Sequence, residues 1–136
     1  MLIDSNILVY ALIASSPKNE RAQTFIKAQK QLVIAQQNIF ETLRVITHPK
    51  FPTPFPVLAA QQAVELITIK ATIIHPTFET TQLALRLIQK YHIFGSEIFD
   101  AYLVATALSN GISELATDNS KHLNKYAEIS VLNPFQ

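Results

Sequence analysis

Five short apolar runs alternate with longer segments of helical periodicity, and this alternation limits the possible folds more than any other feature. The runs that we interpret as strands cover residues 1–4, 31–35, 72–75, 114–117 and 130–132. The helical patterns cover residues 7–13, 18–30, 37–47, 57–69, 77–91 and 98–109. Strands that alternate with helices build βαβ units, in which helices cover both faces of one sheet. We therefore expect an α/β fold, a three-layer α/β/α sandwich with a central, mainly parallel sheet.

Length and composition narrow the class of protein further. The 136 residues predict a single domain over 1–136. Only 15% of them are charged and 49% are hydrophobic, whereas about 25% are charged in an ordinary globular domain. We therefore expect a partner or a second subunit to cover part of the surface. The net charge of +1 gives no basic signature for nucleic acid.

Several other functions are disfavoured by what the sequence lacks. There is no cysteine, no apolar run long enough for a membrane span and no basic signal-peptide start. These features predict a cytoplasmic protein without a membrane partner. With only two glycines, Gly95 and Gly111, the chain also lacks the glycine-rich loops that cradle phosphates in dinucleotide dehydrogenases and nucleotide-driven motors.

The three aspartates of the chain occupy positions that favour a shared site. Asp4 ends the first predicted strand and Asp118 follows the strand over 114–117. Ligands in open parallel sheets gather beyond the carboxyl ends of the strands. Asp100 lies early in the helix over 98–109, on its apolar face, where an unpaired charge is costly. Each has a simpler alternative: a helix cap for Asp4, a carboxylate satisfied by backbone amides for Asp100 and an Asx-turn for Asp118.

Glu41 offers a fourth carboxylate on the helix that follows the second strand. Its simpler alternative is an exposed helix position paired with Arg44, three residues later. Several carboxylates in one site repel each other unless a cation binds, and all-oxygen ligands favour magnesium or manganese. Such a site is suited to phosphodiester hydrolysis or phosphoryl transfer. A phospho-aspartate mechanism is disfavoured because Asn6 stands where a second acid is normally needed.

Four segments resemble the PIN domain family, and in particular the VapC-type toxin ribonucleases of type II toxin–antitoxin systems. They read "LIDSNILVYA", "NIFETLRVITHPKF", "IFDAYLVATALSNGISELATDN" and "VLNPF", and they span nearly the whole chain. The resemblance implies four catalytic, metal-binding acids: Asp4, Glu41, Asp100 and Asp118. It also implies supporting polar groups around them, for which the candidates are Ser5, Asn6, Thr117 and Asn119.

The resemblance further implies the activity and the partners. We expect an endoribonuclease dependent on Mg²⁺ or Mn²⁺, the toxin of a toxin–antitoxin pair, with an RNA substrate, a cognate antitoxin and a homodimeric state. The alternatives are a PIN-fold module that binds RNA or a partner without cutting, and a metal-dependent phosphatase or DNA nuclease. Two departures from the family pattern, at Ala116 and at His122-Leu123, make Asp118 the least secure ligand. Glu97, one helical turn before Asp100, is a further candidate.

Basic and proline-rich segments complete the predictions. Arg44, Lys50 and Lys121 neighbour the acids in sequence, which makes them candidates for contact with RNA phosphates.

The segment 48–56 contains four of the seven prolines and cannot continue a helix. We interpret it as a stiff connection; in the alternative, Phe51 and Phe55 present an apolar edge to a partner or substrate.

Overall fold

A five-stranded sheet forms the centre of the computed structural model, which describes residues 1–136. Its strands are β1 (Leu2–Ile3), β2 (Leu32–Ala35), β3 (Ala71–Ile74), β4 (Glu114–Ala116) and β5 (Ser130–Leu132), arranged in the order β3-β2-β1-β4-β5. Every neighbouring pair is parallel. The predicted α/β class is therefore confirmed, and the sheet is wholly parallel.

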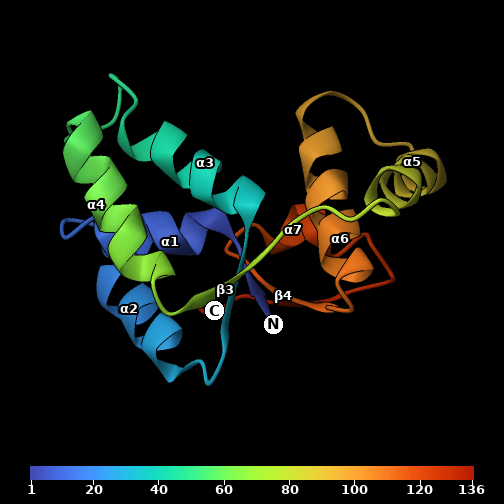
Figure 1. Ribbon diagram of the computed structural model, residues 1–136, viewed down its shortest axis with the longest axis horizontal. Helices are drawn as coiled ribbons and strands as arrows, with labels where there is room; N and C mark the ends of the chain where they lie inside the picture. The colour runs from blue at the N-terminus through green and yellow to red at the C-terminus, as the bar shows by residue number, and fades with distance from the viewer.

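Helices cover both faces of this sheet. Figure 1 shows α1 to α4 on one side of the strands and α5, α6 and α7 on the other. Their bounds are α1 (Ser5–Leu12), α2 (Asn19–Ala28), α3 (Gln36–Ile46), α4 (Val57–Thr68), α5 (Thr80–Tyr91), α6 (Ile98–Ser109) and α7 (Ser120–Leu123), with a short 3₁₀ turn η1 at Gly95–Glu97. The three layers agree with the sandwich that the sequence predicts, while α7 and η1 are additions to the predicted elements.

The strands β1 and β2 are apolar throughout because each of their two faces packs on a different set of helices. Leu2 packs in a hydrophobic cluster with residues of α5 and α6. Ile3 packs in a second hydrophobic cluster with residues of α1 and α2. In β2, Val33 joins the first cluster and Ile34 the second. Side chains of successive residues in a strand point to opposite faces, so a strand buried on both faces reads as a continuous apolar run.

The proline-rich segment is anchored by its two phenylalanines. Phe51 and Phe55 pack against the third apolar cluster, which contains Val9 and Ile46. The backbone N–H of Phe55 also donates to the carbonyl of Ile46, at 2.8 Å. The segment thus connects two helices, as expected, and the rings of Phe51 and Phe55 pack against the protein's own core. None of the helices is long and apolar enough to span a membrane.

The strand order fixes where a site can form. The chain runs outward from β1 through β2 to β3, then crosses to the other side of β1 for β4 and β5. β1 and β4 are therefore neighbours whose following segments diverge, which opens a crevice beyond their carboxyl ends.

Candidate active site

Asp4 lies at this crevice, directly after β1, and its carboxylate also caps the helix that follows. Its Oδ1 accepts from the backbone N–H of Ser5 at 2.7 Å, which caps α1, and from Nδ2 of Asn38 at 3.2 Å. Its Oδ2 accepts from the hydroxyl of Thr117 at 2.6 Å and from Nδ2 of Asn6 at 3.0 Å. This cap explains why α1 begins two residues earlier than predicted.

Burial makes the charge of Asp4 unfavourable in spite of these donors. The residue is only 8% exposed. Burial raises the pKa of Asp4 above its ordinary value, against the opposing effect of the hydrogen bonds from Thr117 and Ser5, and the charge of Glu41 raises it further. An added cation near Asp4 would offset this penalty.

Glu41, on α3, is connected to Asp4 through one hydroxyl group. Oγ of Ser5 donates to Oε2 of Glu41 at 2.9 Å and lies 3.3 Å from Oδ1 of Asp4. Gln37, one turn earlier on α3, donates from Nε2 to the other oxygen of Glu41, at 2.6 Å. The carboxylate of Glu41 therefore faces Asp4 and forms no ion pair with Arg44, contrary to the simpler interpretation.

Asp100, in the first turn of α6, is the least compensated of the acids. Burial raises its pKa to about 6, with further increases from the charges of Asp4 and Glu41 and an opposing effect of His122. Nδ1 of His122 lies 3.9 Å from its Oδ2, beyond hydrogen-bond distance, and no side chain donates a hydrogen bond to Asp100. Asp4, Glu41 and Asp100 thus share one electrostatic environment, although they lie on three separate elements.

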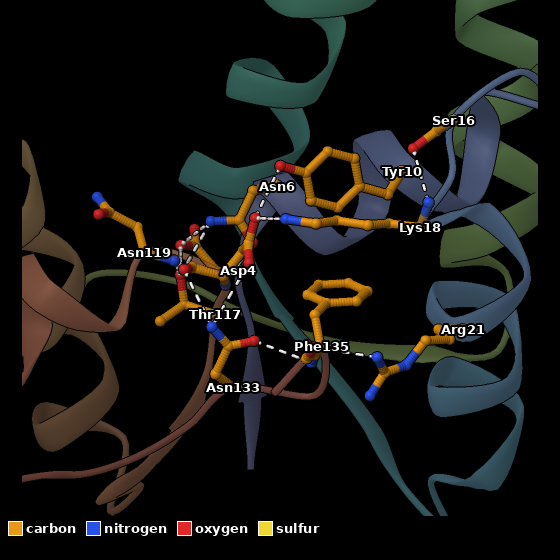
Figure 2. A network of polar contacts seen from close by, with 11 residues as sticks. Asp4, Asn6, Tyr10, Ser16, Lys18, Arg21, Thr117, Asn119, Asn133 and Phe135 are labelled. Atoms are coloured by element: carbon orange, nitrogen blue, oxygen red, sulfur yellow. Dashed lines mark hydrogen bonds and ion pairs between the residues drawn. The ribbon is translucent and has the colours of Figure 1, made fainter.

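The carboxylate of Asp118 is directed elsewhere. Its Oδ2 accepts from Nζ of Lys18 at 2.5 Å and from the hydroxyl of Tyr10 at 2.9 Å. Figure 2 shows the Lys18 side chain passing between the rings of Tyr10 and Phe135, whose centroids lie 5.0 and 5.2 Å from Nζ. Burial raises the pKa of Asp118, but the hydrogen bonds from Lys18 and Tyr10 outweigh this effect and hold the pKa below its ordinary value. The structure therefore does not bring Asp118 to the other three acids.

The supporting polar residues do surround Asp4, as predicted. Asn6 donates from Nδ2 to Asp4 and to the Thr117 hydroxyl, and its Oδ1 accepts from the backbone N–H of Asp118 at 3.1 Å. The backbone N–H of Asn119 donates to the same Thr117 hydroxyl at 3.0 Å. These bonds join the segment after β1 to the segment after β4, and Figure 2 shows them as one continuous network.

A cleft of about 820 Å³ opens beside the acids and is lined largely by α3, η1 and α6. Glu41 and Asp100 line it, together with Asn119, whereas Asp118 does not. Glu97 also lines the cleft, but it is paired with Lys125, whose hydrogen bond lowers the pKa of Glu97.

Of the three residues predicted to contact phosphates, only one lines this cleft. Arg44 lines it and also lines a smaller hollow of about 240 Å³, which Lys50 shares. Lys121 is exposed on α7 and lines neither. Arg44 is therefore the predicted cation that lies where a substrate bound to the acids would reach.

Two residues that hydrogen-bond to the candidate acids were not predicted from the sequence. Asn38 is fully buried and donates to Asp4, and Gln37 orients Glu41. The available signal was their spacing, because they lie three and four residues before Glu41 on one helix and hence on the same face.

The residues present fit a divalent cation. No three histidine, aspartate or glutamate side chains lie close enough together to hold an ion jointly as they stand. The oxygens of Asp4, Glu41 and Asp100 nevertheless form the donor set that Mg²⁺ and Mn²⁺ prefer. Burial, and to a smaller extent the neighbouring negative charges, raise the pKa values of Asp4 and Asp100, and such an ion would oppose this rise.

The chain belongs to the PIN domain family, whose pattern it matches over residues 1–129. This confirms the family that the four sequence segments indicated. No curated protein sequence matches the chain significantly.

Solved structures share the fold at low sequence identity. VapBC2 from Rickettsia felis, crystallised with a DNA fragment from its promoter, matches with a TM-score of 0.74 and 16% identity, over 97% of this chain and 96% of that one. A toxin–antitoxin complex from Klebsiella pneumoniae matches with a TM-score of 0.72 and 21% identity, over 99% and 98%. VapC20 from Mycobacterium tuberculosis, a toxin that cleaves the sarcin-ricin loop, matches with a TM-score of 0.71 and 12% identity, over 94% and 97%.

Proposed function

We propose that this chain is a metal-dependent endoribonuclease that hydrolyses RNA phosphodiester bonds, and that it is the toxin of a toxin–antitoxin pair. The observation that carries the proposal is the convergence of Glu41 and Asp100 on one cleft, with Asp4 joined to Glu41 through the hydroxyl of Ser5. Their mutual repulsion disfavours a purely structural role, since unpaired buried charges destabilise a fold. In this proposal, residues 1–136 act as one PIN-like domain in the cytoplasm, where RNA is accessible.

The proposal gives a role to each acid and to the residues around it. Asp4, Glu41 and Asp100 would hold Mg²⁺ or Mn²⁺, which supplies an activated water and stabilises the charge on the phosphate. Ser5, Asn6, Thr117 and Asn38 keep Asp4 oriented, and Gln37 does the same for Glu41. Arg44 is placed to contact a phosphate of the RNA. Asp118 serves chiefly to hold Lys18 and the C-terminal segment, while Asn119 reaches the cleft.

The proposed partners rest on the structural neighbours. A toxin–antitoxin complex from Klebsiella pneumoniae and FitAcB from Neisseria gonorrhoeae have the same fold. We propose that this chain likewise binds a cognate antitoxin and forms a homodimer.

Cleavage of a single-stranded RNA by the purified protein tests the proposed activity. We expect cleavage in Mg²⁺ or Mn²⁺, its loss in EDTA and its recovery with excess metal. Asp100→Asn and Glu41→Gln should each reduce the rate by roughly a hundredfold or more, because a lost ligand displaces the ion. Asp118→Asn should have a smaller effect, since its carboxylate points away from the cleft.

Matched controls keep this result interpretable. Glu65→Gln and Glu79→Gln alter exposed positions that do not line the cleft and should leave the rate unchanged. Cleavage that persists both in EDTA and in Asp100→Asn would show that the proposed metal site is not responsible.

A non-catalytic PIN module is the second candidate, and one observation favours it. The acids do not enclose an ion as they stand, and the fourth acid of the family pattern is bound to Lys18. For such a module, RNA or protein binding would be unchanged by EDTA and by Asp100→Asn, and no cleavage would occur in any metal.

A further inference from the structure

One face of α3 combines aromatic, acidic, amide and basic side chains. Gln37, Phe40, Glu41 and Arg44 all line the cleft. Their spacing of three, four and seven residues from the first places them on one side of the helix. The side chain of Glu41 is thus flanked along the helix by a phenyl ring and, one turn further on, by a guanidinium group.

A second phenyl ring comes from α6. Phe99 directly precedes Asp100 and lines the same cleft as Phe40. Both phenylalanines are 63% exposed. Single exposed apolar residues are ordinary on a protein surface, but here each ring adjoins an acid of the candidate site, and the two rings share one hollow.

Gln37 connects the two ring-bearing segments and leaves one acceptor free. Its Nε2 donates to Glu41 Oε1 at 2.6 Å and to the backbone carbonyl of Phe99 at 3.1 Å. These two acceptors fix the orientation of the amide. Its Oε1 is buried and has no donor. The Gln37 amide thus holds the backbone of Phe99 beside Glu41.

We infer that Phe40 and Phe99 form a subsite on which unpaired RNA bases stack beside the cleavage centre. The inference rests on the proposed function and adds its substrate class, single-stranded RNA with accessible bases. Base stacking on an aromatic ring tolerates any base and requires no hydrogen-bond readout. Arg44, which lines the same cleft, supplies a contact for a neighbouring phosphate.

Binding measurements test the subsite independently of cleavage. The probes are an end-labelled oligouridylate and an abasic oligomer with the same number of riboses and phosphates, both followed by fluorescence anisotropy in Ca²⁺. We expect Phe40→Ala and Phe99→Ala each to weaken oligouridylate binding roughly tenfold, as loss of one stacked base does. Binding of the abasic oligomer should be unchanged, and Phe40→Trp and Phe99→Trp should restore oligouridylate binding.

Phe78→Ala is the matched control. Phe78 is 93% exposed after β3 and does not line the cleft, so its removal should affect neither probe. Because all three rings are exposed, thermal melts should show that every alanine variant is folded.

The possible results separate this inference from the proposed function. Base-dependent binding without cleavage in any metal would support the subsite and contradict the proposed endoribonuclease. Wild-type protein that binds both probes alike, or neither, would overturn the subsite even if it cleaves RNA. The subsite would also be overturned if the alanine variants bound the two probes equally less well, or lost only self-association in light scattering, since the rings would then contact protein.

Discussion

At the scale of single residues, Asp100 shows how a functional group can oppose stability. It is partly buried with no hydrogen-bond donor, and its pKa is about 6 against an ordinary value of 3.8. The unfolded chain therefore releases this proton at lower pH than the folded chain does. Between these two values the contribution of Asp100 to the free energy of unfolding falls as pH rises, and above them the loss is complete.

This behaviour predicts that Asp100→Asn stabilises the metal-free protein. At neutral pH in EDTA the variant should melt above the wild type, and the gap should narrow as pH falls from about 6 toward 4. Mg²⁺ should raise the melting temperature of the wild type but not that of the variant. Thermal melts across this pH range measure both effects, with Glu79→Gln as the control. A variant that melts below the wild type in EDTA at neutral pH would contradict the interpretation.

Asp4 is a poorer probe of the same repulsion. Its two oxygens accept from four donors, one each on Ser5, Asn6, Asn38 and Thr117. An asparagine amide would point N–H groups at some of these donors, so Asp4→Asn would lose hydrogen bonds as well as charge. Any change in its stability would mix the two effects.

At the scale of elements, the site depends on how β1 and β4 are joined at their carboxyl ends. The Thr117 hydroxyl donates to Asp4 and accepts from Asn6 and from the backbone N–H of Asn119. This one buried group therefore connects the start of α1 with the segment leading into α7. Its position explains how two chain segments more than a hundred residues apart hold one carboxylate in place.

Thr117→Val tests this junction, because valine has nearly the shape of threonine but no hydroxyl. The loss leaves buried donors and an acceptor without partners, which should cost about 1–3 kcal/mol in the free energy of unfolding. It should also weaken Mg²⁺ binding, since Asp4 loses an orienting donor. Urea unfolding and a metal titration measure the two effects.

Thr42→Val provides the matched comparison for Thr117→Val. Thr42 is equally buried, but its hydroxyl donates only to the carbonyl of Asn38 within α3. We expect a smaller loss of stability and no change in Mg²⁺ binding. Equal effects of the two substitutions would show that the β1–β4 junction has no special role.

At the scale of the whole molecule, the low charge content corresponds to a large exposed apolar surface. The exposed apolar side chains outside the cleft include Val57, Leu58, Leu66 and Ile69, all on or next to α4. Large apolar side chains that gather on one exposed helix can mark a surface that contacts protein. The composition led us to expect a partner or a second subunit on part of the surface. These exposed side chains support that expectation.

We therefore predict that the purified chain self-associates, or co-purifies with an antitoxin. Light scattering should give about twice the mass of the 15.2 kDa chain, or the mass of a hetero-complex. Leu66→Lys, which places a charge on the exposed face of α4, should favour the monomer if that face is the interface. A monomer at micromolar concentration, with no partner recovered, would contradict the prediction.

The sequence alone determined the fold class and the approximate place of the five strands and the six longer helices. Strand and helix patterns are local, so these features and the placement of Asp4 at a strand end follow from periodicity, whereas the bounds of α1 and the short elements η1 and α7 do not. The grouping of Asp4, Glu41 and Asp100 followed from the family resemblance and from the rule that ligands gather at the carboxyl ends of strands. Even the cap on α1 could be predicted, because it involves adjacent residues.

Only the tertiary structure decided the direction of Asp118 and the surroundings of the cleft. Lys18 lies a hundred residues from Asp118 in sequence, and Lys125 pairs with Glu97 across a gap of 28 residues. No local pattern encodes such contacts. A carboxylate turns toward whichever cation the packing of separate elements brings within reach, and for Asp118 that cation is the ammonium group of Lys18 beside the rings of Tyr10 and Phe135.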